Sequence, residues 1–219
     1  MRTIVKTLLA GIALSGLAQA QEPKYQEGTH YQTLEQVAGY QPIDGVEVTE
    51  VFSYLCNHCA TFEPYMQAWK ERLPEGVTLT RIPVEFGRPA WALYALAYVT
   101  ASVMGVAEES HPLMMDVLWK EKRQMRNIDE LADFYTQFGV DKAKFISTSE
   151  SFAVDMRIRR EQQLVQTYGV NATPTMVVNG KYRVTANDFD TTLAVVDYLV
   201  AQELTKLDSG QVADQPATE

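Results

Sequence analysis

The sequence predicts an α/β fold in which a mixed β-sheet is interrupted by a long all-helical insertion. Three observations lead to this fold class. A strand–helix–strand pattern occupies residues 46–86 and is typical of a parallel βαβ unit. No strand pattern follows from Pro89 to Tyr168, a stretch too long to be a loop. Two short strand-like runs then flank Asn179-Gly180, a dipeptide typical of antiparallel hairpins, so the sheet must be mixed.

The first twenty residues predict a signal peptide that is cleaved on export. The stretch begins with basic residues, Arg2 and Lys6, and ends in the small-residue pattern Ala18-Gln19-Ala20. Its apolar part, residues 8–18, is too short to span a bilayer, which takes roughly twenty apolar residues. We therefore expect residues 1–20 to be removed and the mature protein to reside in the periplasm.

The charge of the chain restricts its partners. The 219 residues include 19 Lys+Arg against 28 Asp+Glu, a formal net charge of −9. Cleavage after residue 20 would leave 17 basic residues against 28 acidic ones, a net charge of −11. Nucleic acids and anionic membrane surfaces both attract basic proteins, so neither is expected as a partner.

The βαβ unit begins after a short strand that we expect near Thr29–Thr33. The segment "VEVTEVFSYL", residues 46–55, is rich in β-branched and aromatic side chains and predicts a buried strand, with Glu50 as its exception. A helix is expected to begin at Cys56 and run to about Arg72. The segment "VTLTRIPVEF", residues 77–86, predicts the second strand.

The helical stretch divides into several predicted helices before the hairpin. One begins with Asn127 followed by Glu130, as in a capping box, and ends at Gly139. After the hairpin, "TPTMVVNGKYRV" at residues 173–184, a last helix is expected from about Asp188 to Leu204. We predict a sheet domain from residues 21–88 and 156–205, an inserted helical domain from residues 89–155, and a disordered polar tail from residues 206–219.

Cys56 and Cys59 are the only cysteines in the chain, and such a pair can form a metal or haem site, a structural disulfide or a reactive site. A zinc site needs further ligands, but His30 and His111 are not spaced as a ligand pair. A c-type haem needs histidine directly after the second cysteine, where Ala60 stands. We therefore expect no metal and no cofactor. A purely structural disulfide would close a very small loop and so add little stability.

The position of the pair favours a reactive site. A cysteine at a helix N-terminus faces free backbone N–H groups and the positive end of the helix dipole, and both stabilise its thiolate. Cys59 lies one turn further on and should be more buried. We therefore expect Cys56 to attack and Cys59 to resolve the mixed disulfide. Between them, Asn57 and His58 are the residues best placed to set the strength of the oxidant.

Two acidic residues flank the pair. A carboxylate inside an apolar strand should have a raised pKa, and two interpretations of Glu50 remain open. Its side chain either reaches the sheet edge or a lysine, or it accepts a proton from Cys59 during exchange. We expect Glu63, two turns after Cys56 along its helix, to be a surface charge, with tuning of the Cys56 thiolate as its alternative role. The bond before Pro174 opens the late strand, and the sequence does not reveal whether it is cis.

Taken together, "EVFSYLCNHCATFE", "VNATPTMVVNGKY" and the helical stretch between them resemble the DsbA family of exported thiol:disulfide oxidoreductases. The resemblance implies a thioredoxin-like fold with an inserted helical domain. It also implies that Cys56 is the nucleophile, that Cys59 is the resolving cysteine, and that Pro174 is a cis-proline. By the same resemblance, Thr173 would offer its backbone to an extended substrate, and Glu50 would be the buried acid below Cys59. A quinone-linked inner-membrane protein of the DsbB type would reoxidise the cysteine pair.

The chain departs from the family's best-known motif at Asn57, where that motif has proline. Thr173 before the cis-proline also resembles the isomerase and reductase branches of thioredoxin-fold enzymes. Our main hypothesis is a periplasmic oxidase that passes its disulfide to unfolded or reduced exported proteins. The alternatives are a reductase or isomerase, and a non-catalytic peptide-binding chaperone. No separate dimerisation segment is seen, so a monomer is expected.

Overall fold

The computed structural model describes residues 24–35, 40 and 43–209. The predicted signal peptide, residues 1–20, lies outside the described residues, as does the predicted tail from residue 210 onward. Within the described ranges, no helix is long and apolar enough to cross a membrane.

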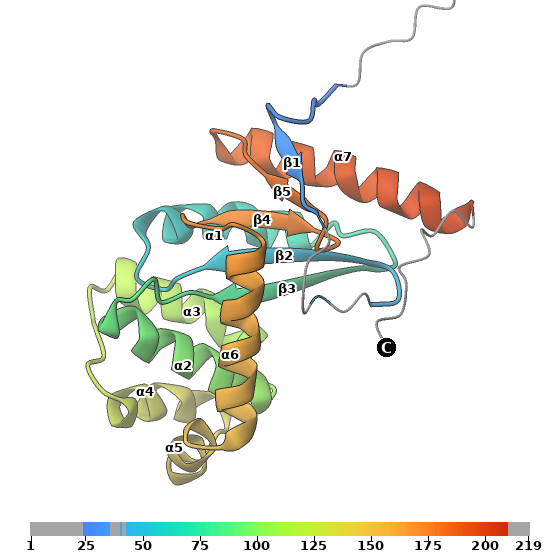
Figure 1. Ribbon diagram of the computed structural model, residues 1–219. Helices are drawn as coiled ribbons and strands as arrows, with labels where there is room; N and C mark the ends of the chain where they lie inside the picture. The colour runs from blue at the N-terminus through green and yellow to red at the C-terminus, as the bar shows by residue number, and fades with distance from the viewer. Residues whose placement is uncertain (1–23, 36–39, 41–42, 210–219) are drawn as a thin grey trace, which may run out of the picture.

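The sheet has five strands in the order β1-β5-β4-β2-β3 (Figure 1). Strands β2 and β3 run parallel, whereas the pairs β2–β4, β4–β5 and β1–β5 are antiparallel. The predicted mixed sheet is thus confirmed, including the parallel βαβ unit and the late hairpin. The strands are β1 (Tyr31–Thr33), β2 (Val46–Phe52), β3 (Val77–Pro83), β4 (Thr175–Val178) and β5 (Tyr182–Val184).

Two layers of helices cover the sheet because its strands alternate their side chains between the faces. Val48 of β2 packs in one core with helices α1 (Asn57–Lys70) and α7 (Phe189–Asp208). Val51 of β2 points the opposite way and packs against α6 (Phe152–Thr167). Figure 1 shows α6 crossing the near face of the sheet and continuing down beside the helical block.

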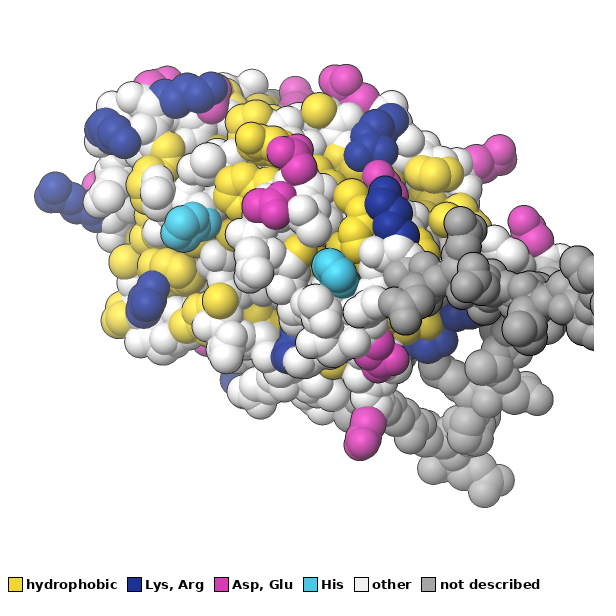
Figure 2. Space-filling model, turned by 90° about the horizontal axis from the view of Figure 1, so that it is seen from above, with side chains coloured by type: hydrophobic (Ala, Val, Ile, Leu, Met, Phe, Trp, Pro, Cys, Tyr) yellow, Lys and Arg dark blue, Asp and Glu magenta, His cyan; other side chains and the backbone are white. Residues whose placement is uncertain are grey.

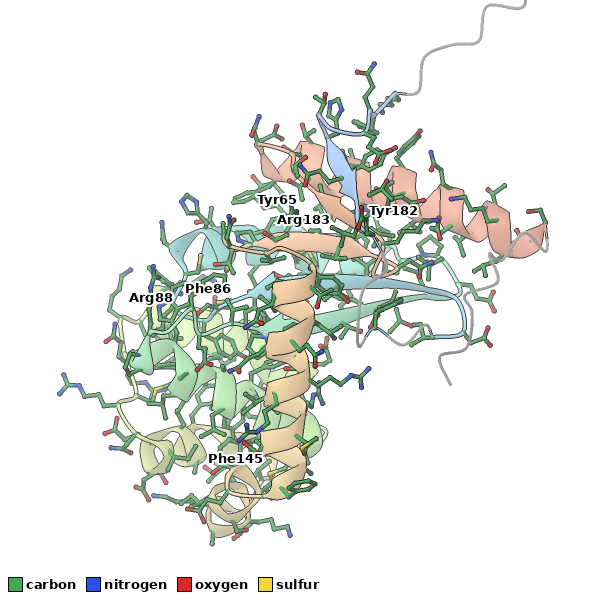
Figure 3. All side chains as sticks on the ribbon, in the orientation of Figure 1. Tyr65, Phe86, Arg88, Phe145, Tyr182 and Arg183 are labelled. Atoms are coloured by element: carbon green, nitrogen blue, oxygen red, sulfur yellow. The ribbon has the colours of Figure 1, made fainter. Side chains whose placement is uncertain are left out.

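The helical block has a core of its own that continues into the active-site region. Tyr135 and Phe145 stack in it with ring centroids 4.5 Å apart, and Figure 3 shows Phe145 at the far end from the sheet. The same buried cluster includes Cys56 and Cys59. The block consists of α2 (Pro89–Val103), α3 (Ala107–Trp119), α4 (Ile128–Tyr135), the short 3-10 helix η1 (Thr136–Phe138) and α5 (Lys142–Ser149).

Capping residues in the sequence predicted the two ends of the helical segment that begins after Asn127. The Asn127 side chain accepts a hydrogen bond from the Glu130 backbone N–H at 2.9 Å, as the capping box predicts, and Gly139 is left-handed with φ of 75°. The expected end of the last helix at Leu204 was wrong, because α7 continues to Asp208. Lys206 pairs there with Glu203 at 2.6 Å, so the first residues assigned to the tail belong to a helix.

Gly45 fixes the turn into β2. Its φ is +100°, and a Cβ there would lie 2.2 Å from the carbonyl oxygen of Gly76. That oxygen also accepts the backbone N–H of Val46 at 2.8 Å, so it cannot move away without losing a hydrogen bond. Gly28 is also left-handed, with φ of +81°, but has nothing within 4 Å of its would-be Cβ.

We predict that Gly45→Ala lowers the free energy of unfolding by about 2–4 kcal/mol, since it adds a backbone clash to an unfavourable φ. Gly28→Ala is the matched control and should cost only about 1 kcal/mol, the strain of the backbone alone. Urea denaturation of both variants measures the difference. Equal losses of stability would contradict the close approach of residues 45 and 76.

Candidate active site

Cys56 lies at the junction between β2 and α1. It is the N-cap of α1, with extended backbone angles, and its carbonyl accepts the first helical hydrogen bond from Ala60 at 3.1 Å. No side chain caps this end of the helix. The backbone N–H groups of the first turn therefore remain free to donate to the sulfur of Cys56. Cys56 is 8% exposed and Cys59 is fully buried, and the two thiols are unbridged.

The surroundings of Cys56 favour its thiolate. The pKa of the Cys56 thiol is lowered to about 5, chiefly because the Cys59 side chain hydrogen-bonds to its sulfur. A hydrogen bond from the Thr173 side chain and those from the backbone N–H groups of His58 and Cys59 lower the pKa further, while burial opposes them. A low pKa makes this sulfur both a ready nucleophile and a good leaving group.

Cys59 is the opposite case. Burial raises its pKa above the usual range, and its hydrogen bond with Cys56 and the thiolate charge of Cys56 raise it further. The two sulfurs are therefore unequal, and Cys59 is the more buried one, as expected. Asn57 and His58 between them are both exposed to solvent, where they border any molecule that approaches Cys56.

The Thr173-Pro174 peptide bond is cis, as the family resemblance implied. The sulfur of Cys56 lies 3.4 Å from the carbonyl oxygen of Thr173, to which its thiol can donate. Strand β4 begins at the next residue and pairs with β2 through Thr175 and Val51. That pairing brings segments more than a hundred positions apart in sequence to the same end of the sheet.

Glu50 is fully buried, and its partner is neither a lysine nor the sheet edge. Arg81 stands opposite it on β3, and the Arg81 Nε donates to Glu50 Oε2 at 2.9 Å. The pKa of Glu50 is raised to about 7, because burial and the charge of Glu63 outweigh the attraction of Arg81. Its second oxygen has no hydrogen-bond partner in the described residues, and its charge acts on the Cys59 thiol.

The prediction that Glu63 is a surface charge was wrong. Glu63 follows Cys59 by one turn of α1, so it faces inward and is only 5% exposed. Its Oε2 lies 3.2 Å from Nε2 of the buried His111, whose Nδ1 lies 3.1 Å from the Tyr54 hydroxyl. A carboxylate only accepts hydrogen bonds, so Nε2 donates to Glu63 and Nδ1 accepts from Tyr54.

Opposite influences keep this pair as a carboxylate and a neutral imidazole. Burial favours the protonated form of Glu63, but the hydrogen bond from His111 and the charge of Arg81 lower its pKa overall. Burial and the charge of Arg81 lower the pKa of His111. Arg81 thus lies between three carboxylates, those of Glu50, Glu63 and Glu108. The Oε2 atom of Glu108 is 3.0 Å from Nη1 of Arg81. Sequence reasoning did not find Arg81, His111 or Glu108.

Glu50, Glu63 and His111 also approach one another as metal ligands could. One donor atom from each lies within 4.8 Å of the others. The Arg81 guanidinium already contacts Glu50 and lies 3.9 Å from Glu63, and His111 donates its proton to Glu63. The positive charge that these carboxylates require is therefore supplied by a side chain, which makes the cluster an ion-pair network.

We predict that the Cys56 pKa depends on the hydrogen bond from Cys59. In Cys59→Ala the pKa should rise from about 5 toward the ordinary thiol value of about 8.5, because the donor is lost. Cys59→Ser keeps a hydroxyl donor and should show a smaller rise. Ultraviolet absorbance of the thiolate during a pH titration measures both variants. The same midpoint near 5 in both would show that Cys59 is not the cause.

Comparisons with known proteins agree with this geometry. Residues 90–197 match the family model of the DSBA-like thioredoxin domain. The chain is 37% identical over 207 residues to the thiol:disulfide interchange protein DsbA of Pseudomonas aeruginosa, covering 93% of this chain and 97% of that protein. The corresponding protein of Burkholderia cepacia is 31% identical over 207 residues, covering 92% and 97%.

Solved structures show the same fold. The DsbA of Xylella fastidiosa superposes with a TM-score of 0.74 at 35% identity, covering 83% of this chain and 98% of that one. The DsbA of Pseudomonas aeruginosa superposes with a TM-score of 0.75 at 36% identity, covering 84% and 97%. With its paired cysteines at a helix N-terminus beside a cis-proline, this chain belongs to the DsbA family of thiol:disulfide oxidoreductases.

Proposed function

We propose that the protein is a periplasmic dithiol oxidase that donates its Cys56–Cys59 disulfide to reduced exported proteins. The observation that supports this direction of transfer is the stabilised Cys56 thiolate at the start of α1. A stabilised thiolate favours the reduced form of the pair, so the disulfide gives up its oxidising equivalents readily. An enzyme that works as a reductase needs the opposite preference.

The exchange proceeds in two balanced steps. A substrate thiolate attacks the Cys56 sulfur, which breaks the Cys56–Cys59 bond and releases Cys59 as a thiolate. A second substrate thiolate then attacks the substrate sulfur of the mixed disulfide and releases the Cys56 thiolate. The substrate loses two electrons and gains a disulfide, and the enzyme gains the two electrons as a dithiol. Cys56 suits the leaving role because its pKa is about 5.

Glu50 donates a proton to the Cys59 thiolate and accepts it back from the Cys59 thiol. A buried Cys59 thiolate with a raised pKa takes up a proton as soon as it forms. Glu50 has a pKa of about 7, so near neutral pH it can supply that proton and can accept it again when the pair is reoxidised. Its unpartnered oxygen and its electrostatic influence on Cys59 support this role.

Thr173 and Pro174 form the proposed docking edge for the substrate backbone. Both are partly exposed, and the Thr173 carbonyl lies beside the Cys56 sulfur. An extended substrate segment can pair with the backbone there as an added strand. We further propose that the protein acts as a monomer and that a quinone-linked membrane protein of the DsbB type restores its disulfide.

Equilibration with glutathione buffers tests the direction of transfer. We expect the Cys56–Cys59 pair to be much more oxidising than thioredoxin, whose potential is about −270 mV. In Cys59→Ala, the Cys56 thiolate can still attack a disulfide of an exported protein and release one of its two sulfurs as a thiolate, but no Cys59 thiol remains to resolve the mixed disulfide, which should accumulate on Cys56. A potential as low as that of thioredoxin would rule out the oxidase and favour a reductase. Absence of mixed disulfides would favour a non-catalytic chaperone.

We predict that Glu50→Gln slows substrate oxidation about tenfold or more at pH 6, because the proton donor is lost. The ratio of wild-type to variant rates should fall as the pH rises through about 7, since wild-type Glu50 then loses its proton. Stopped-flow kinetics at several pH values measure this ratio, with the exposed Glu75→Gln as control. A ratio independent of pH would contradict a proton-transfer role.

A further inference from the structure

Two pockets lie beside the residues that flank Cys56, and the mechanism above uses neither. The larger, of about 400 Å³, lies between α1 and α3 and includes Asn57 and Ala60 in its wall. The smaller, of about 120 Å³, includes Leu55. Trp119 and Lys122 belong to the walls of both. Because residues 55 and 57 are the immediate neighbours of Cys56, a molecule bonded to that sulfur lies next to this pair of pockets.

Trp119 is a fixed wall between the two pockets. Its indole Nε1 donates to the Tyr54 carbonyl oxygen at 2.8 Å, which ties the end of α3 to the loop that carries Cys56. The indole is partly exposed, so its remaining surface is open to a ligand. An aromatic ring held in this way presents apolar area without losing conformational entropy on binding.

Lys122 supplies a positive charge at the same place. Its Nζ lies 5.4 Å from the centroid of the Trp119 ring, and its side chain is exposed. Its φ is 58°, a left-handed conformation in which glycine or asparagine would be less strained. Backbone strain of this kind is concentrated at functional sites, which agrees with a role for this loop in binding.

Two neighbouring basic residues have acidic partners, and one of these pairs, Lys120 with Asp116, lies in the wall of the larger pocket. Lys120 pairs with Asp116 at 2.7 Å, and Arg123 lies 3.8 Å from Glu121, whereas Lys122 has no ion pair in the described part of the chain. Residues 120–126 contain four basic residues and one acidic residue in a chain of net charge −9. Figure 2 shows several Lys and Arg side chains around hydrophobic ones at its left-hand end, the end where Figure 1 shows the loop between α3 and α4.

The length of an extended substrate segment indicates which part of the substrate can fill these pockets. A substrate cysteine bonded to Cys56 fixes the chain on either side of it, and an extended residue spans about 3.3–3.6 Å. Side chains two or so positions from that cysteine can therefore contact Trp119 and Lys122. A glutamate or aspartate matches both, because its stem can pack on the indole while its carboxylate meets the ammonium group.

We propose that Trp119 and Lys122 form a specificity subsite that favours substrates with an acidic residue close to the reacting cysteine. This inference rests on the proposed oxidation of protein thiols and adds a preference among substrates. The net negative charge of the chain opposes the approach of acidic segments, so the preference has to come from the local positive charge of residues 120–126.

A series of dithiol peptides tests the subsite. Peptides that carry Glu, Gln or Lys two residues before or after the first cysteine should be oxidised with kcat/KM in the order Glu, Gln, Lys. Each step should be about two- to five-fold, the range of a partly exposed ion pair, and should shrink at high salt. The readout is the ratio of the Glu peptide to the Lys peptide for each enzyme variant, so a general loss of activity cancels.

Lys122→Glu should invert this ratio, and Lys122→Gly should bring it close to one while relieving the backbone strain. The matched control is Lys24→Glu, because Lys24 also lies over an aromatic ring, that of Tyr25 at 5.2 Å, but stands before β1. It should keep the wild-type ratio. An unchanged ratio in both Lys122 variants, or no preference in the wild type, would overturn the subsite. Failure of the wild type to oxidise any of the peptides or dithiothreitol would instead count against the proposed function.

Discussion

The position of the Cys56 sulfur at the open end of α1 is the constraint on which the rest of the site depends. A sulfur at that place is stabilised as a thiolate by the Cys59 side chain and by backbone N–H groups of the first turn. The helix can begin there only because β2 ends four residues earlier, between β3 and β4. The antiparallel partner β4 in turn brings Thr173 to within 3.4 Å of the sulfur. Sheet order, helix start and redox chemistry are therefore parts of one geometric arrangement.

A second arrangement connects the helical block to this site. Helix α3 supplies His111, Glu108 and Trp119, which contact Glu63, Arg81 and the Tyr54 carbonyl respectively. Removing one member of such a buried ion-pair network leaves an uncompensated charge, which costs several kcal/mol. The block therefore does more than cover the sheet, because the charge of Glu108 adds to the raised pKa of Glu50.

The sequence allowed the order of elements and the reactive pair to be predicted, because those signals are local. The Val-rich strand before Cys56, the Asn127 capping box and Asn179-Gly180 each act within a few residues of themselves. The contacts of Glu50, Glu63 and His111 depend on which elements pack together, and no short pattern contains that information. Glu63 could have been found from its spacing of one helical turn from a buried Cys59. Arg81 became a candidate only once the register between β2 and β3 was known.

The most direct test of the account compares the stability of the reduced and oxidised protein as a function of pH. The folded-state pKa of Cys56 is about 5, below the unfolded value of about 8.5, so the thiolate stabilises the folded reduced protein fully above that unfolded value. This contribution should decline as the pH falls and disappear below about 5, whereas the oxidised protein has no such thiol to titrate. Denaturant unfolding should therefore show the reduced form to be the more stable at pH 7, with the gap closing toward pH 5. A more stable oxidised form at pH 7 would contradict the account.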